Sequence, residues 1–245
     1  MKRGLWITVA ALLAFAAIIL ARLPAAWVVP ASGKSAVGCT GVDGTLWSGS
    51  CTGLFVDRKP VGDLTWELKP HRLLAGRLAA HVTLASALAH GSADAEVGLH
   101  GQLITHDLTA DLPLDPQIMP GLPPGLRGQA HLALALLEVE HDTLKRLQGR
   151  IEVHDLEDRD GRATQLGSYV VTFPPGDGEP TGQIKDLDGP LSVEGTLRLT
   201  RQGGFDVQGT VAPKPGAPAD LTDNLRFLGS PDASGRRQFS LSGTF

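Results

Sequence analysis

Apolar and polar residues alternate at every second position along many short runs of the chain, and this pattern constrains the fold more than any other feature. The clearest runs are 97–103, 108–114, 131–136, 150–154, 190–199, 205–211 and 238–245. A period of two places the apolar side chains of a strand on one face of a sheet. A sheet with one face toward water is typically antiparallel. The chain is therefore predicted to be mainly β, an antiparallel sheet with few short helices.

Glycine in the last strand-like runs adds a prediction about the shape of this sheet. Gly195, Gly209 and Gly243 each occupy a position where the alternation calls for an apolar side chain. A glycine inside a strand commonly marks a bulge or a close backbone approach. Three in the same phase predict a curved sheet. The clearest helical pattern is 220–228, where Asp220 can cap a helix that has Leu221, Leu225 and Leu228 on one face.

The N-terminal segment has the features of a membrane anchor. Residues 5–21 carry no charge, and Lys2 and Arg3 precede them. A spanning helix needs about 17–25 apolar residues, and basic flanks tend to stay cytoplasmic. We expect a cytoplasmic tail at 1–4, a transmembrane signal-anchor helix at 5–23 and an exported, periplasmic β-rich domain at 24–245. The alternative is a cleaved signal peptide, although no clear small-residue cleavage site follows the apolar run.

Cys39 and Cys51 are the only cysteines, and both lie in the expected exported part. In an oxidising compartment such a pair usually forms a disulfide. If Asp43 and Gly44 formed a two-residue hairpin turn, Cys39 would face Ser48 and not Cys51. The bridge therefore requires a bulge, a longer loop or a neighbouring strand.

Catalytic and metal sites find no support in the sequence. The eight histidines include no pair at a ligand spacing, and no Gly-x-Ser-x-Gly elbow or phosphate-binding loop is present. The acidic residues between 155 and 160 do not follow the calcium-loop pattern. A net charge of −4, with acidic and basic residues interspersed, argues against nucleic acid. We therefore expect no enzyme activity, no cofactor and no metal.

One ordered set of short motifs resembles a known family. The set comprises 42–49 (VDGTLWSG), 64–76 (LTWELKPHRLLAG), 166–169 (LGSY), 188–191 (DGPL), 194–197 (EGTL) and 228–236 (LGSPDASGR), after an N-terminal apolar segment that ends near Leu23. In this order the motifs resemble protein N of the bacterial type II secretion system. The likeness extends over nearly the whole chain.

The resemblance implies an accessory component of the machine that exports folded periplasmic proteins through an outer-membrane secretin. It implies an inner-membrane location, with the platform proteins of that membrane and the secretin as partners. The chain is also similar in outline to AsmA-like proteins, in which a membrane anchor precedes a curved antiparallel sheet that forms a groove.

Two functions from different classes are consistent with these features. The first is a scaffold that docks onto secretion proteins through exposed strand edges. The second is a lipid-binding or lipid-transfer groove with an apolar floor. Gly44, Thr45, Leu46, Trp47, Gly49 and Trp66 form the candidate motif: they either bind a partner or act as turn and core residues at the start of the sheet.

Overall fold

The computed structural model describes residues 12, 15, 19, 21–27, 37–57, 59–87, 89–99, 101–117, 122–141, 143–160, 164–200 and 203–244. These residues divide into two compact units, Met1–Ala87 and Leu88–Phe245, and each unit is described by itself. Most of the expected membrane helix at 5–23 lies outside the described residues. Among those that are described, no helix is long and apolar enough to span a membrane.

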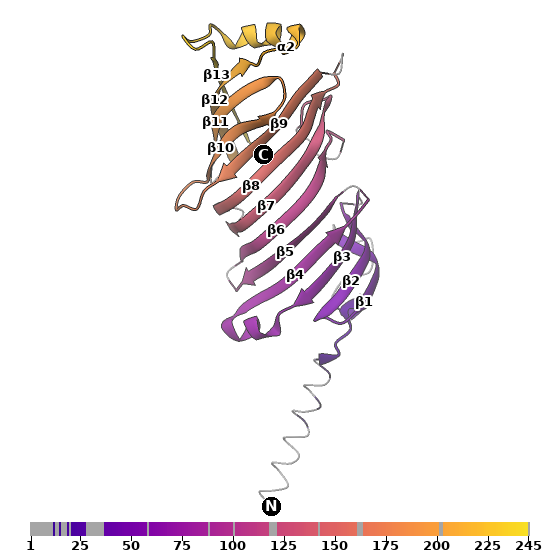
Figure 1. Cartoon of the computed structure of the whole chain (residues 1–245). Helices are drawn as coiled ribbons and strands as arrows, with labels where there is room; N and C mark the ends of the chain where they lie inside the picture. Colours follow the sequence, from indigo (N-terminus) through magenta and orange to yellow (C-terminus); the bar gives the residue numbers. More distant parts are fainter. Residues whose placement is uncertain are drawn as a thin grey trace, which may run out of the picture. The chain divides into compact units, whose positions relative to one another are not determined.

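The first unit is a four-stranded antiparallel sheet in which each strand pairs with its neighbour in the chain (Figure 1). Its elements are η1 (Ala25–Trp27), β1 (Val37–Gly44), β2 (Ser48–Val56), β3 (Lys59–Leu68), η2 (Pro70–Ala75) and β4 (Arg77–Ala85). Because consecutive turns alternate between the two ends of an antiparallel sheet, the β1–β2 turn and the η2 turn lie at the same end. The β2–β3 turn lies at the opposite end.

The second unit continues this plan with nine strands, again antiparallel and in chain order. They are β5 (His90–Gly98), β6 (Gln102–Leu114), β7 (Leu126–Glu140), β8 (Thr143–Asp158), β9 (Thr164–Phe173), β10 (Thr181–Asp188), β11 (Leu191–Leu199), β12 (Gly204–Pro213) and β13 (Arg237–Thr244). The helical segment α2 (Ala219–Asn224) and η3 (Leu225–Leu228) precedes β13. The prediction of a mainly β, antiparallel fold with few short helices is thus confirmed, and the sheet is not closed.

Two apolar clusters form the core of the second unit. Leu134, Leu147 and Phe173 form one, and residues of β6 and β11 pack against it. The other joins Leu191, Val193 and Val211 of the sheet to Leu221 and Leu225 of α2 and η3. The helical segment therefore covers the apolar face of β11 and β12.

Two details of the sequence prediction are wrong. The run 97–103 is not one strand, because Leu99 and Gly101 lie in the β5–β6 turn and Val97 pairs with Leu103 across it. Alternation continued through the turn because apolar residues flank it on both sides. Asp220 does not cap α2 either: Pro218 occupies the cap position, and its carbonyl oxygen accepts a hydrogen bond from the Thr222 N–H at 3.0 Å. Asp220 lies in the first turn instead.

The in-phase glycines mark close approaches in the sheet. Gly195 pairs with Gly209, and Gly209 pairs in turn with Phe239. A Cβ added at Gly209 would lie 2.8 Å from the Phe239 ring, and one added at Gly243 would lie 2.7 Å from the Phe205 ring. At Gly209 and Gly243 aromatic rings therefore occupy the space that the glycines leave open.

Asp186 holds together the turn between β10 and β11. Its carboxylate accepts a hydrogen bond from the Val193 N–H at 2.8 Å and pairs with the Lys214 ammonium at 2.7 Å. Burial raises the pKa of Asp186, but the Lys214 ammonium and the Val193 N–H lower it by more, so the pKa lies below its usual value. The folded state therefore favours the ionised carboxylate.

Asp186→Asn is expected to lower the free energy of unfolding at pH 7 by about 1–3 kcal/mol, since a charged hydrogen-bonded group is lost. The pKa of Asp186 is lowered on folding, so its contribution is present above the unfolded pKa of about 3.9 and is lost as the pH falls through the folded pKa. Urea unfolding at pH 7 and in acid should show the difference between variant and wild type shrinking in acid. Asp177→Asn, in an exposed loop, is the control, and equal effects of the two changes would contradict the prediction.

Candidate functional site

The candidate motif is built around the β1–β2 turn. Gly44 ends β1 with a φ of +92°, a conformation that glycine adopts readily. The Thr45 N–H donates to the Ser48 carbonyl oxygen at 2.9 Å, and the Thr45 hydroxyl accepts a hydrogen bond from the Ser48 N–H at 3.2 Å. The turn is therefore residues 45–48 and not Asp43–Gly44.

Leu46 connects this turn to two other segments of the unit. Its N–H donates to the Leu23 carbonyl oxygen at 2.8 Å, and its carbonyl oxygen accepts the Trp66 indole N–H at 3.1 Å. Pro24 forms a β-bridge with Thr45, and Ala25 is 1% exposed. The β1–β2 turn therefore contacts Leu23 and Pro24, where the expected membrane segment ends.

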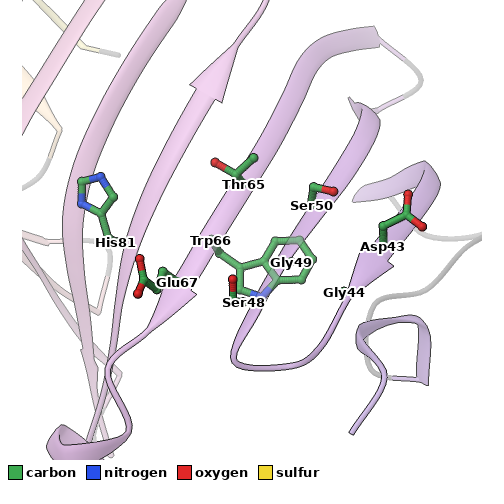
Figure 2. A pocket seen from close by; sticks show the side chains of 9 residues that line it. All are labelled: Asp43, Gly44, Ser48, Gly49, Ser50, Thr65, Trp66, Glu67 and His81. Atoms are coloured by element: carbon green, nitrogen blue, oxygen red, sulfur yellow. The ribbon is translucent and has the colours of Figure 1, made fainter. Parts of the chain in front are cut away.

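The remaining members of the motif fix the strands beside this turn. Gly49 lies under the Trp66 ring, and a Cβ at this position would come within 2.5 Å of Cζ2 of that ring (Figure 2). The Trp47 carbonyl oxygen accepts a hydrogen bond from the Leu68 N–H at 2.6 Å. All six candidate residues therefore meet at one end of the first unit.

Cys39 and Cys51 form the expected disulfide, with a Cα–Cα distance of 5.5 Å. They are not register partners, since Cys39 lies opposite Leu54 and Cys51 lies opposite Val42. The pairing of β2 with β3 shifts between Cys51 and Leu54, and Gly53 in this stretch has a φ of +61°. An irregularity of the strand, one of the routes expected from the sequence, thus accompanies the bridge.

A shallow depression of about 440 Å³ lies beside the motif, on β1 to β4 (Figure 2). Its lining residues are Asp43, Gly44, Ser48, Gly49, Ser50, Thr65, Trp66, Glu67 and His81. Carboxylates, hydroxyls and an imidazole make this surface suited to hydrogen bonding with a polar partner. Within the described part of the chain, no cluster of ligand residues could hold a metal ion.

Sequence reasoning found the motif but missed much of its surroundings. The link from Leu46 to Leu23 joins two backbone groups, which leave no mark in the residue types. The pairing of Glu67 with His81 depends on the register of β3 and β4. The alternation around Glu67 and His81 indicates that both lie on strands. The pairing of the two residues follows only when the register of these strands is known.

Comparison with known proteins places the chain in a family. The model of the family described as "Type II secretion system (T2SS), protein N" matches residues 35–240. The chain belongs to this family. Two curated proteins named "Type II secretion system protein N" are similar to it: that of Aeromonas hydrophila is 29% identical over 96% of both chains, and that of Vibrio cholerae serotype O1 is 29% identical over 83% of both. No solved structure matches the chain.

For this protein N family member, the match includes β1 to β12, the start of β13 and the whole candidate motif. The resemblance read from the short motifs is therefore confirmed. The comparison assigns no role to single residues, so the part that Gly44 to Trp47, Gly49 and Trp66 play in binding a partner stays a prediction.

Trp66→Phe tests whether the indole hydrogen bond to Leu46 stabilises the β1–β2 turn. The ring is kept, but the indole N–H that donates to Leu46 is lost, at a cost of about 0.5–1.5 kcal/mol. Hydrogen exchange of residues 44–48 should become faster than in wild type. Trp27→Phe is the matched control, because Trp27 is 81% exposed. Unchanged exchange in Trp66→Phe would show that the indole hydrogen bond does not hold the turn.

Proposed function

We propose that this protein is an accessory component of a type II secretion system, anchored in the inner membrane, whose periplasmic sheet is a non-catalytic scaffold. It assists the export of folded proteins across the outer membrane by contacting platform proteins of the inner membrane and the secretin. The family match over residues 35–240 carries this proposal. The names of both similar proteins agree with it.

Two observations support the proposed location. The uncharged segment 5–21, preceded by Lys2 and Arg3, is suited to a span with a cytoplasmic N-terminus. The Cys39–Cys51 disulfide is typical of an oxidising compartment such as the periplasm. Residues 24–245 then lie in the periplasm. Alkaline phosphatase fused after Phe245 should be active, because the fusion places it in the periplasm. An inactive fusion would contradict the proposed orientation.

The scaffold is favoured over a lipid groove by the way the apolar face is covered. Val193 and Val211 are 9% and 4% exposed, and Leu221 and Leu225 pack on them. Protein side chains thus fill the space that an acyl chain would need on β11 and β12. In the described residues β13 pairs only with β12, so its other edge is suited to adding a strand from a partner.

Photo-crosslinking in native membranes tests the proposal. A photoreactive residue is placed at exposed Ser242 of β13 and, in a matched variant, at buried Val193. Adducts with secretion proteins from position 242, and none from position 193, are expected. Phe227, which is highly exposed on the helical segment, is a second surface position that controls for random collisions.

Lipid adducts from the buried position would contradict the scaffold. Lipid adducts at position 193, with no secretion protein captured from position 242, would overturn the scaffold and favour the lipid groove. Loss of secretion on deletion of the chain, restored by the wild-type protein, is expected in either case because family membership does not depend on the mode of contact.

A further inference from the structure

The η2 turn exposes large apolar side chains at the end of the first unit that receives the N-terminal segment. Leu74 is 94% exposed and Leu73 is 43% exposed, and Leu78, at the start of β4, is 48% exposed. The turn appears in Figure 1 as the short coil that precedes β4. Leucines this exposed, in adjacent positions, are costly in water and are typical of a surface that contacts an apolar phase.

Basic residues flank these leucines in the chain. Lys69, Arg72 and Arg77 lie in and beside the turn, and no acidic residue occurs from Leu68 to Ala93. The nearest acidic residues that the structure places at this end are Glu67 and Asp43, on the strands beside the depression. Exposed leucines with Lys and Arg close to them in the chain are the composition that binds the interface of an anionic bilayer.

Backbone hydrogen bonds connect the turn to the end of the expected span. Leu23 accepts a hydrogen bond from Leu46, and in the same β1–β2 turn Trp47 accepts one from Leu68, the residue that ends β3 before η2. The η2 turn and the β1–β2 turn lie at the same end of the unit. If residues 5–23 span the membrane, this end faces the bilayer.

We propose that the η2 turn rests in the surface of the same membrane, with Leu73, Leu74 and Leu78 in the interface and the basic residues on anionic phospholipid headgroups. This contact rests on the proposed membrane anchor and adds a second point of attachment. Two attachment points hold the first unit in a fixed orientation on the membrane. The tendency of basic residues to remain cytoplasmic applies to short loops and not to long translocated domains.

The test measures the depth of single positions in the full chain. Leu74→Cys carries an environment-sensitive fluorophore, and the protein is reconstituted into vesicles of phosphatidylcholine and phosphatidylglycerol in equal amounts that contain a nitroxide-labelled lipid. An interfacial position lies about 5–10 Å into the boundary between headgroups and acyl chains. We expect a blue shift at position 74 and quenching several-fold stronger than at the control position.

Val56→Cys is the matched control. It carries the same fluorophore on the same unit, but Val56 ends β2 at the β2–β3 turn, about 25 Å from Ser48 at a rise of about 3.3 Å per residue. Both positions are exposed, so neither change removes a core contact. Far-UV circular dichroism of the two labelled proteins verifies that both remain folded.

The outcomes separate this inference from the proposed function. Protein that floats with the vesicles but shows weak, equal quenching at positions 74 and 56 overturns the membrane contact and leaves the anchor intact. Protein that does not float with the vesicles overturns the anchor and the contact together. If quenching at position 74 is as strong in pure phosphatidylcholine as in the mixed vesicles, the leucine contact is supported. The proposed role of the basic residues is then wrong.

Discussion

Replacement of Phe173 by alanine is expected to lower the free energy of unfolding by about 3–5 kcal/mol, because it leaves a cavity in a packed core. Phe173 is 2% exposed and packs with Leu134 and Leu147. Gly182 lies against its ring, since a Cβ there would come within 2.9 Å of Cε1. The loss is a large part of the stability of a typical domain, about 5–15 kcal/mol.

Urea unfolding followed by far-UV circular dichroism measures this effect, and hydrogen exchange locates it in peptides of β7 to β9. Phe227→Ala is the matched control, because Phe227 is 90% exposed. An exposed substitution of this kind is expected to change stability by no more than about 0.5 kcal/mol. Equal effects of the two substitutions would mean that the cluster around Phe173 does not support the second unit.

Removal of the disulfide is expected to have the second largest effect. Replacing Cys39 and Cys51 together by serine opens a loop with a sequence separation of 12. In the chain-entropy model this costs about 3 kcal/mol, because the unfolded chain gains freedom. Cys51 is also 1% exposed, so a serine hydroxyl there is buried.

Tryptophan emission reports this change, because Trp6, Trp27, Trp47 and Trp66 all precede residue 88. The urea midpoint of the emission change should fall in the double variant and, to a similar extent, in wild type treated with a reductant. The reductant should leave the double variant unchanged, which controls for its other effects. A wild-type midpoint that does not respond to reductant would show that the bridge does not stabilise this unit.

Alternation predicted the strands because it reflects a constraint that acts along the whole chain. Apolar side chains gather on one face of many strands, and runs such as 131–136 and 205–211 fall within β7 and β12. The pattern failed at 97–103, where a tight turn lies between two apolar residues. Periodicity records which residues point inward, but it does not record where the chain reverses.

The candidate site was only partly accessible to sequence reasoning. Its tryptophans and glycines stood out because large rings and missing side chains must fit each other, as Trp66 and Gly49 do. The contacts of Leu46 with Leu23 and of Trp47 with Leu68 use backbone atoms that every residue carries. Such contacts depend on the register of strands, which an isolated sequence does not determine.

The ordering of strands within each unit affects how the chain can fold while it is being synthesised. Each new strand pairs with the one made just before it, so no strand in a unit waits for a distant partner. Loop closure between neighbours requires little entropy, and sheets of this kind have a low contact order for a β protein. A chain synthesised from its N-terminus can therefore add one strand at a time, and each new strand covers the edge that the previous strand left open.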